Sequence, residues 1–317
     1  MDRKKRVAIC MSEKKFKKLN FQEICKTCDE YGLEAFKLDL NLSLEEQEPF
    51  SVVLHKLTDV ITASNEGDKK TCLILSKIEN YIKTHPNLIV IDPLPNIQKV
   101  LNRFITYKTI YTSVSHTENI FTPNFCELVN PDIKDIKEQL RQSNITFPII
   151  CKAVPGHGSQ NSHQMSIIFN ESGLKDCRIP SVVQKFIKHN AILYKIFTVG
   201  DKHSFVERPS LKNYMACDLR KTIFFESTNV SKSDSKSELS ILDPQEKVKN
   251  FFPNPDIFDF ISKSIRQAFG MDLLGIDVII CNETGKYGII DVNAFPGYDG
   301  FQNFNKCLIE CILQKLN

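Results

Sequence analysis

The fold is decided by the stretch GIDVIICNETGKYGIIDVNAFPG, which covers residues 275–297. It contains two apolar runs of strand length, separated by the turn-like segment NETGK. Side chains two residues apart on a strand point to the same side, so we expect Asp291 and Asn293 to share one face of a sheet. If the two strands pair as a hairpin, Asp277 on the first strand meets them there.

These three side chains predict a magnesium site. Two carboxylates and an amide oxygen are hard ligands, and magnesium usually completes its shell with water and substrate phosphates. The alternative is that Asp277 and Asp291 are strand-end acids that accept backbone N–H groups. Acids inside runs as apolar as GIDVII and GIIDVN are costly without a partner, which favours the metal. We therefore expect an ATP-dependent enzyme with Asp277, Asp291 and Asn293 as metal ligands.

The composition argues against several other classes of protein. With 317 residues, 42% hydrophobic and 25% charged, the chain is expected to form two or three packed, soluble lobes. No apolar run approaches the roughly 20 residues that span a bilayer, so no membrane association is expected. A net charge of +3 is too small for a general nucleic-acid surface. Eleven scattered cysteines and no secretion signal indicate a cytoplasmic protein, and no apolar surface pattern demands a partner, so we expect a monomer.

Three segments with different patterns are expected to form three domains, over residues 1–102, 103–198 and 199–317. In the first segment, short apolar runs alternate with amphipathic stretches, which is typical of a small, mostly parallel sheet. In the second, the runs FPIICKAV, QMSIIF, SVVQKFI and AILYKIFTV predict strands, at least the first two of them antiparallel. The third segment adds further strands and ends in the hairpin and a final helix.

Two helices are expected beside these strands. One spans residues 95–112. The other places four apolar side chains on one face and ends at Gly270, where a glycine suits the C-terminal cap. The four side chains are Ile257, Phe260, Ile261 and Ile265.

Two further features fit a nucleotide, although each has an ordinary structural explanation. Lys152 ends the strand FPIICK and precedes a glycine-rich loop, so it can hold phosphates while backbone amides approach them. An exposed loop with a surface lysine is an equally good interpretation. The strand VVQKFI can pair its backbone with an adenine edge, with Val183 and Phe186 as apolar walls. A buried core strand explains that run equally well.

Dispersed cations form a third feature. His55 and Lys56 end the apolar strand SVVLHK, and Lys195 interrupts the run AILYKIF. In an open α/β sheet, ligands bind beyond the carboxyl ends of the strands, where Lys56 is expected to lie. Each cation alone is more typical of a solvated surface. Together they indicate a polyanionic substrate beside the nucleotide: Lys15, Lys56, His163, Lys195 and Arg208, with Arg103 between the lobes.

Seven motifs lie along nearly the whole chain: SEKKFKKLNFQ, HKLTDVI, DPLPNIQ, FPIICKAVPGHGSQNSHQM, VVQKFIKHNAILYKIF, ERPSLKNY, and GIDVII followed by DVNAFPGYDG. In these motifs the chain resembles the inositol 1,3,4-trisphosphate 5/6-kinases, the family of the inositol-tetrakisphosphate 1-kinases. The resemblance implies an ATP-grasp fold of the α/β (α+β) class. In that fold a Rossmann-like lobe with a parallel sheet precedes two lobes with mainly antiparallel sheets, which clamp ATP.

The resemblance also implies roles for individual residues. ATP contacts are expected from Arg103, Lys152, Gln184, Lys185, Phe186, Ile187, Ser210, Ser227 and Ser231. Contacts with the inositol phosphate are expected from Lys15, Lys56, His157, Gly158, His163, Lys195, Arg208, Asn293 and Gly297. Two magnesium ions are expected on Asp277, Asp291 and Asn293, and Lys195, His163 and Asp291 are expected to act in catalysis.

The implied reaction is transfer of the γ-phosphoryl group of MgATP to a ring hydroxyl of an inositol polyphosphate. The expected acceptors are inositol 1,3,4-trisphosphate, at position 5 or 6, and inositol 3,4,5,6-tetrakisphosphate, at position 1. One alternative is an ATP-grasp carboxylate–amine ligase, which shares the ATP and metal sites but forms an acyl phosphate. Another is a nucleotide-binding regulatory protein that performs no chemistry.

Overall fold

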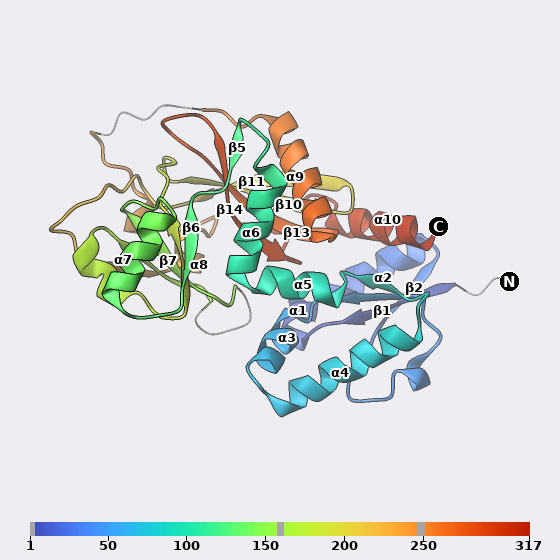
Figure 1. Ribbon diagram of the computed structural model, residues 1–317. Coiled ribbons are helices and arrows are strands. Elements are labelled where there is room, and N and C mark those ends of the chain that lie inside the picture. The colour runs from blue at the N-terminus through green and yellow to red at the C-terminus, as the bar shows by residue number, and fades with distance from the viewer. Residues whose placement is uncertain (1–3, 157–161, 246–250) are drawn as a thin grey trace.

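The computed structural model describes residues 4–156, 162–245 and 251–317, which fold around three sheets (Figure 1). The N-terminal sheet has the order β2-β1-β3-β4 and is parallel throughout, as the alternating pattern predicts. Its strands are β1 (Lys5–Cys10), β2 (Leu33–Lys37), β3 (Val52–His55) and β4 (Ile89–Ile91). The connections contain α1 (Glu13–Lys18), α2 (Phe21–Glu30), α3 (Thr58–Asn65) and α4 (Lys69–Thr84), with a 3-10 turn at Glu45–Gln47.

Helices cover both faces of this parallel sheet. Val7 and Ile9 of β1 belong to one buried cluster with α2 and the C-terminal helix α10 (Phe304–Leu316). Ala8 and Cys10, which point the other way, belong to a second cluster with α3 and α4. A strand that is apolar on both faces is characteristic of a parallel sheet with helices on either side.

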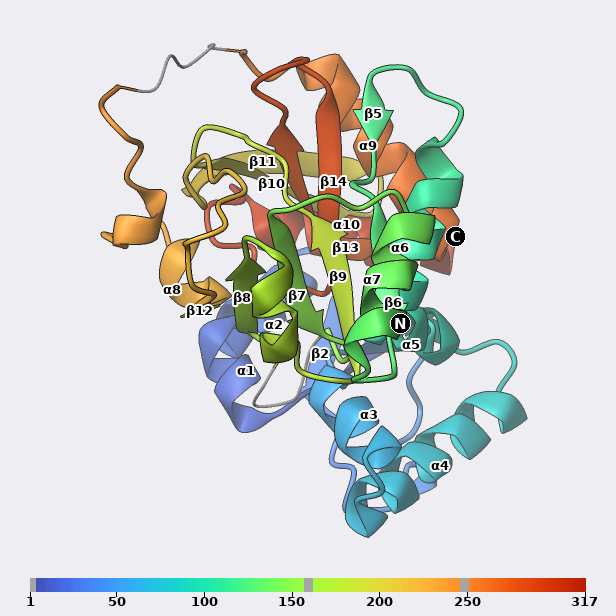
Figure 2. The same cartoon turned by 60° about the vertical axis from the view of Figure 1, so that its left-hand side comes forward.

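Two five-stranded sheets form the rest of the molecule (Figure 2). The central sheet, β12-β8-β7-β9-β6, is antiparallel. The C-terminal sheet, β11-β10-β13-β14-β5, is antiparallel except for the pair β14 and β5. The strands are β5 (Ile120–Phe121), β6 (Phe125–Leu128), β7 (Ile149–Ala153), β8 (Gln164–Ile168), β9 (Ser181–Lys185), β10 (Ile192–Val199), β11 (Lys202–Pro209), β12 (Ile223–Glu226), β13 (Leu273–Ile280) and β14 (Tyr287–Ala294).

The chain passes between these two sheets more than once. β5 precedes the central strands in sequence but joins the C-terminal sheet, whereas β12 follows β11 but joins the central sheet. β10 lies ahead of the boundary at 198/199 expected from the sequence, yet it pairs with β13. The central sheet is therefore built from two separate stretches of chain, β6–β9 and β12, and the C-terminal sheet from three, β5, β10–β11 and β13–β14.

The helix predicted over residues 95–112 consists of two helices, α5 (Leu94–Leu101) and α6 (Arg103–Val114). Asn102 between them has an extended backbone, with φ −97° and ψ 108°, and its side chain accepts a hydrogen bond from the first turn of α6. Asn102 also forms a β-bridge with Pro155, beside the central sheet. The prediction of one helix is wrong because this bridge and the N-cap outweigh helix propensity.

Helix α9 (Pro255–Phe269) ends at Gly270, whose φ of 61° suits the expected cap. Its buried face differs from the predicted one, because Phe260 is 40% exposed whereas Phe258 is fully buried. Residues two positions apart on a helix are separated by about 200° around its axis, so Phe260 lies on the opposite side from Phe258. The buried residues are Phe258, Ile261, Ser262, Ile265 and Phe269.

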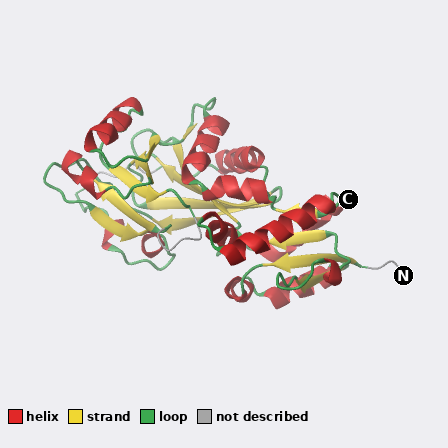
Figure 3. Cartoon of the chain, turned by 60° about the horizontal axis from the view of Figure 1, so that its bottom comes forward, coloured by secondary structure: helices red, strands yellow, loops and turns green. Residues whose placement is uncertain are grey.

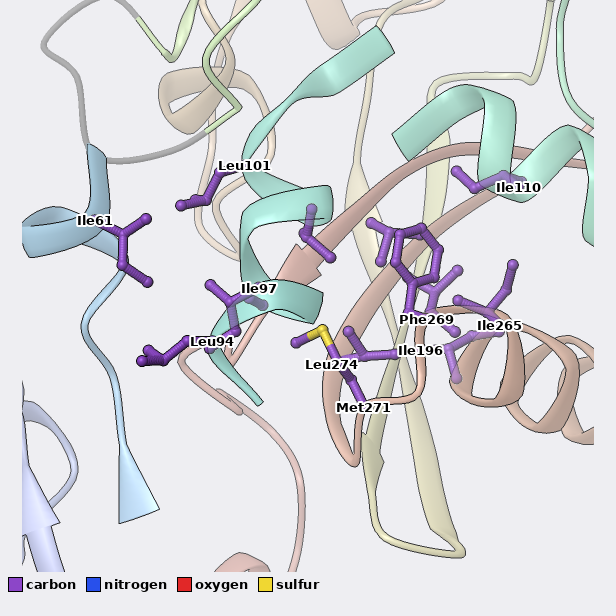
Figure 4. Packing of buried hydrophobic residues seen from close by; sticks show 14 of the residues in the cluster. Ile61, Leu94, Ile97, Leu101, Ile110, Ile196, Ile265, Phe269, Met271 and Leu274 are labelled. Carbon is purple, nitrogen blue, oxygen red and sulfur yellow. The ribbon is translucent and has the colours of Figure 1, made fainter. Parts of the chain in front are cut away.

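The largest core lies where α5, α6 and α9 cover one face of the C-terminal sheet (Figure 4). There Ile196 of β10 and Leu274 of β13 lie in one cluster with Ile110 of α6 and with Ile265 and Phe269 of α9. Because side chains alternate along a strand, the residues of β10 and β13 that flank these core residues in sequence point to the opposite face of the sheet. That face carries the residues of the site described below.

On the central sheet, α7 (Ile133–Gln142) covers the outer face, where Ile136 and Leu140 lie in one cluster with Cys151 and Val183. Figure 3 shows helices flanking the strand layers. Shorter turns complete the fold: a 3-10 helix at Glu171–Asp176, α8 (Ser227–Val230) and a 3-10 turn at Glu238–Ser240. Within the described ranges, no helix is both long and apolar enough to cross a membrane.

The corrected face of α9 gives a stability prediction. We expect Phe258→Ala to lower the free energy of unfolding by about 3–5 kcal/mol, because it opens a cavity in the core. The matched change Phe260→Ala removes a half-exposed ring from the same helix and should cost no more than about 0.5 kcal/mol. Urea unfolding measures both values. Equal losses in the two variants would contradict the observed orientation of the helix.

Candidate active site

The side chains predicted to form the metal site lie on one face of the β13–β14 hairpin. Asp277 is directly opposite Asp291 in the antiparallel register, and Gly275 is opposite Asn293. Val278, the neighbour of Asp277, points into the core under α6 and α9. The predicted hairpin is therefore confirmed, and both carboxylates point toward the central sheet.

A β-bulge at Ile290 shapes this hairpin. The register shifts after Asp277, so Val278 is opposite Ile289 and Ile290 has no partner on β13. The Ile290 carbonyl accepts a hydrogen bond of 3.2 Å from Lys152 Nζ, which reaches across from β7. The bulge thus helps to hold a lysine of the central sheet next to the acid pair.

Lys152 is only 6% exposed. Its ammonium also donates to the Tyr107 hydroxyl at 2.6 Å and to Gln184 Oε1 at 3.0 Å. Burial lowers the pKa of Lys152 to about 8, and the negative charge of Asp291 limits that fall. The three groups that accept its protons are neutral, so an anionic ligand at this point would meet a desolvated cation.

Arg103 compensates the charge of Asp291. It is 2% exposed at the first position of α6, and its Nη1 lies 2.5 Å from Asp291 Oδ2. Its Nε donates to the Ala153 carbonyl at 3.0 Å, and its Nη2 donates to the Ser162 carbonyl at 3.3 Å. The break between α5 and α6 makes this geometry possible, because a new helix begins at Arg103 beside β7.

Asp277 is compensated by a different cation. Lys195 is opposite it on β10, and Lys195 Nζ lies 3.4 Å from Asp277 Oδ1. Burial raises the pKa of Asp277; the attraction of Lys195 opposes this rise, while repulsion from Asp291 adds to it. Among the described residues, this buried Oδ1 accepts no hydrogen bond of good geometry. The carboxylate therefore retains an oxygen that suits a further cation.

Two adjoining clefts meet at the acid pair. The first includes Ile150, Leu211 and Ile279 among its apolar walls. Most residues predicted to contact the nucleotide line it: Lys152, Gln184, Lys185, Phe186, Ile187, Ser210, Ser227 and Ser231. Arg103, which was assigned to the same group, lines the second cleft instead.

Val183 is not a wall of the first cleft, although the sequence predicts it as one. Its side chain is buried on the other face of β9, in the cluster under α7. Gln184 and Phe186 share the face toward the cleft because they are two residues apart. Because side chains alternate along a strand, a shift of one residue in the predicted alternation assigned Val183 to the wrong face of β9.

A buried histidine supports the wall of the first cleft. His189 Nδ1 lies 2.6 Å from the Ile187 carbonyl, and its Nε2 lies 2.7 Å from Ser210 Oγ. A carbonyl only accepts, so Nδ1 carries the proton and the Ser210 hydroxyl donates to Nε2. Burial lowers the pKa of His189 to about 4, which keeps the ring neutral. Ser210 therefore offers oxygen lone pairs, and not its proton, to a ligand.

The second cleft is rich in cations. Of the residues predicted to contact the substrate or the metal, it is lined by His163, Lys195, Arg208, Asp277, Asp291, Asn293 and Gly297. It shares Met165, Ser227, Ser231, Asp277 and Asp291 with the first cleft. The two clefts are therefore continuous, and the acid pair lies at their junction.

Lys15 and Lys56 do not line either cleft. Lys15 Nζ donates to the Lys56 carbonyl and to Asp59 Oδ1, both at 2.7 Å. Lys56 Nζ donates to the carbonyl of Pro296, a residue that lines the second cleft. Burial, together with repulsion from Lys15 and Lys18, lowers the pKa of Lys56 to about 8. These two lysines thus lie behind the lining of the cationic cleft.

The remaining predicted residues, His157 and Gly158, lie outside the described residues. Other residues were not assigned to the site from the sequence but belong to it. Lys18 and Lys232 line the cationic cleft. Lys18 stands in the basic motif SEKKFKKLNFQ, and a Cβ at Gly297 would lie 2.7 Å from its Nζ. No sequence signal identifies Tyr107 or His189, because their contacts arise only from the fold.

Solved structures with a similar architecture include ATP-grasp ligases. The ATP-grasp ligase PsnB, in complex with a minimal precursor, matches with a TM-score of 0.58 and 12% identity over 98% of each chain. D-alanine–D-alanine ligase from Bacillus anthracis, in complex with ATP, matches with a TM-score of 0.58 and 14% identity over 99% of this chain and 97% of that chain. These identities show the fold alone. The protein has the ATP-grasp fold, as the resemblance implies.

Sequence comparison defines the family. Residues 6–97 match the pre-ATP-grasp domain, and residues 114–314 the ATP-grasp domain, of inositol 1,3,4-trisphosphate 5/6-kinases. The inositol-tetrakisphosphate 1-kinase of Xenopus laevis is 44% identical over 305 residues, and that of Danio rerio is 42% identical over 304. Each match covers 95% of this chain and 76% of the relative. The chain belongs to the inositol 1,3,4-trisphosphate 5/6-kinase family.

The contacts of Lys152 give a prediction about its titration. We expect Tyr107→Phe to lower the pKa of Lys152 below its value of about 8, because the ammonium loses one acceptor. Tyr111→Phe, which changes a 57% exposed ring on the same helix, should leave this pKa unchanged. The ¹³Cε shift of labelled lysine, assigned with Lys152→Arg, follows the titration. A Lys152 pKa near the ordinary lysine value of about 10.4 would contradict the site as described.

Proposed function

We propose that this protein is an ATP-dependent kinase that phosphorylates ring hydroxyls of inositol polyphosphates. The observation that carries the proposal is the junction of the two clefts at Asp277 and Asp291. A partly apolar cleft lies on one side of the acid pair, and a cationic cleft lies on the other. A terminal phosphoryl group held at the pair therefore faces a site for a second, highly charged molecule.

We infer that adenine binds beyond the end of β9. The N–H groups of Lys185 and Phe186 already donate to backbone carbonyls, whereas the Ile187 N–H has no partner within the described chain. It is therefore available to the purine edge, with Phe186 and Leu211 as apolar neighbours. Gln184 Nε2, buried in the same cleft without a partner among the described residues, is a second available donor.

The acid pair fits magnesium. No group of three or more His, Cys, Asp or Glu side chains suited to a metal occurs in the described ranges. A magnesium site does not need one, because Asp277, Asp291 and Asn293 can be completed by phosphate oxygens and water. The raised pKa of Asp277 indicates that its charge is only partly compensated, and its Oδ1, which accepts no hydrogen bond of good geometry among the described residues, suits a cation at this position. Bound there, two magnesium ions would neutralise charge on the ATP phosphates.

The cations of the site have separate tasks in the proposed reaction. Phosphoryl transfer depends mainly on alignment and charge neutralisation. Lys152 approaches the phosphates from the nucleotide side, while Lys195 faces them from β10. His163 contributes differently, since burial lowers its pKa and leaves the ring mostly neutral near pH 7. It therefore acts as a hydrogen-bonding group more than as a cation.

The substrate class follows from charge. Each phosphate carries about −1.5 to −2 at neutral pH, so an inositol polyphosphate needs several cations. Arg208, whose Nη2 is held by the Asp299 carbonyl at 2.7 Å, and Lys18 and Lys232 supply further ones. The Xenopus laevis and Danio rerio relatives are named for inositol tetrakisphosphate. The proposed reactions are phosphorylation of inositol 3,4,5,6-tetrakisphosphate at position 1 and of inositol 1,3,4-trisphosphate at position 5 or 6.

The alternatives have weaker support. A carboxylate–amine ligase shares the fold, but the ligases are 12–14% identical to this chain and the match covers the fold alone. The cations of the second cleft suit several phosphates better than a single carboxylate and an amine. A regulatory protein without chemistry has no use for two buried, facing carboxylates at the end of a nucleotide cleft. We further propose that the kinase is a cytoplasmic monomer, consistent with eleven free cysteines.

The direct test is a product-resolved kinase assay with inositol tris- and tetrakisphosphate isomers. We expect MgATP-dependent phosphorylation of both proposed substrates, with products identified by anion-exchange chromatography. D-alanine and other amino acids, assayed for release of inorganic phosphate, test the ligase alternative. ATP binding without phosphorylation of any inositol phosphate would refute the kinase proposal.

The metal assignment gives a second prediction. Asp291→Asn should lower turnover by more than the roughly 10–100-fold that outer-shell changes cost, because a ligand charge is lost. Asn is preferred to Ala because its amide oxygen can still accept a hydrogen bond from the buried Arg103 Nη1, whereas Ala removes this acceptor as well as the charge; breaking a buried ion pair costs about 3–5 kcal/mol. Titration calorimetry with magnesium and ADP should show weakened metal binding in the variant, while thermal unfolding confirms that it is folded. Unchanged turnover or magnesium affinity would exclude Asp291 as a ligand.

A further inference from the structure

A buried carboxylate outside both clefts joins the N-terminal lobe to the catalytic hairpin. Asp92 follows β4 and is 2% exposed. Its Oδ1 accepts the Asp272 N–H at 2.7 Å, and its Oδ2 accepts the Leu273 N–H at 3.0 Å. Leu273 is the first residue of β13, the strand that carries Asp277. One side chain of the N-terminal lobe therefore holds the start of that strand.

The backbone of Asp92 holds the strand that leads to Lys56. The Asp92 carbonyl lies 2.7 Å from Nε2 of His55, a residue that is 1% exposed at the end of β3. Since a carbonyl only accepts, Nε2 carries the proton. Burial lowers the pKa of His55 to about 4, so the ring is neutral and this tautomer persists at neutral pH. The residue after His55 is Lys56.

Two more hydrogen bonds close a ring. The Leu273 carbonyl accepts the Phe295 N–H at 2.8 Å. Pro296 follows Phe295 in the chain, and its carbonyl accepts a hydrogen bond from Lys56 Nζ at 3.1 Å. We call this closed path the Asp92 ring. Its members are His55, Lys56, Asp92, Leu273, Phe295 and Pro296. It holds Lys56 at both ends, through its backbone neighbour and through its ammonium.

The Asp92 ring adjoins only the substrate side of the site. Pro296 lines the cationic cleft, and none of the six members lines the nucleotide cleft. Lys15 is linked to the ring as well, because its ammonium donates to the Lys56 carbonyl at 2.7 Å. Gly297, which follows Pro296, lines the cationic cleft beside Lys18. A change in the ring should therefore alter binding of the inositol polyphosphate more than binding of ATP.

We propose that Asp92 is a positioning residue for the inositol polyphosphate. It sets the placement of Lys15 and Lys56 relative to Asn293 and Gly297 without touching either substrate, and this role rests on the proposed kinase function. Two N–H donors require two acceptor oxygens. Neither Asn nor Glu can replace Asp92 in this role. Asn offers one acceptor oxygen and presents its NH₂ group to the second N–H donor, and Glu adds a methylene to a site that is almost fully buried.

The test compares two buried acids that are neighbours. Asp92→Asn should raise the KM for inositol polyphosphate about tenfold and leave the dissociation constant of an ATP analogue within about twofold, because one hydrogen bond to a charged group is lost. Asp272→Asn is the matched control. Its carboxylate, paired with Arg266 at 3.1 Å and Lys315 at 2.5 Å, is outside the ring, since only its backbone N–H contacts Asp92. This control should lose stability with little change in KM.

A second pair of variants tests the ring at a different link. His55→Leu removes the donor to the Asp92 carbonyl and should raise the same KM, whereas His55→Gln, whose Nε2 can donate to that carbonyl, should restore it. Asp92 would have only a structural role if the KM for inositol polyphosphate and the dissociation constant of the ATP analogue rose in parallel. The same conclusion would follow if Asp92→Asn and Asp272→Asn shifted this KM equally. The His55 pair decides the question if Asp92→Asn does not fold.

A readout without catalysis separates this proposal from the kinase proposal. In Asp92→Asn, we expect faster hydrogen exchange at the Phe295 amide and a changed ¹³Cε titration of Lys56, which has a pKa of about 8 in the native protein. If native protein phosphorylates no inositol polyphosphate, the kinase proposal fails. If exchange at Phe295 and the Lys56 titration do not change, the Asp92 ring is refuted whatever the substrate is.

Discussion

Two carboxylates facing each other across the β13–β14 hairpin impose the strongest constraint on this structure. Buried acids repel one another, and a buried charge without a partner costs several kcal/mol. Arg103 from α6 lies against Asp291, Lys195 from β10 lies against Asp277, and Lys152 from β7 reaches the bulge at Ile290, beside Asp291. One helix and one strand from each of the two sheets are thus held around one pair of charges. The ion pairs that stabilise this arrangement also border the junction of the two clefts, where phosphates and their counter-ions can bind.

Local periodicity explains what the sequence could predict. The hairpin, the shared face of Asp291 and Asn293, and the parallel N-terminal sheet all follow from strand alternation and βαβ spacing. The errors arise where a distant contact or a phase of one residue decides the outcome. The bridge from Asn102 to Pro155 divides one predicted helix into two. Val183 and Phe260 are apolar residues whose faces are decided by the register and packing of their neighbours.

The candidate site shows the same division. Lys195 was recognisable because it interrupts an apolar strand, and Lys152 because it ends one beside a glycine-rich loop. Tyr107 and His189 had no such signal, since they act through partners on other elements. Lys15 and Lys56 were recognisable as cations, but their location behind the cleft was not. That location depends on contacts between Asp92 and β13, which are about 180 residues apart in sequence and therefore invisible to any local pattern.

The exchange of strands between the two large sheets has a consequence for biosynthesis. A nascent chain that has left the ribosome through β12 can complete the central sheet. At that stage β5 has no partner, because β14 has not yet been translated. Both acids also lie on strands that are made late, so no translation intermediate ending before β14 contains the pair. The protein thus acquires its capacity for phosphoryl chemistry only once β14 has been made, when the hairpin binds strands made much earlier.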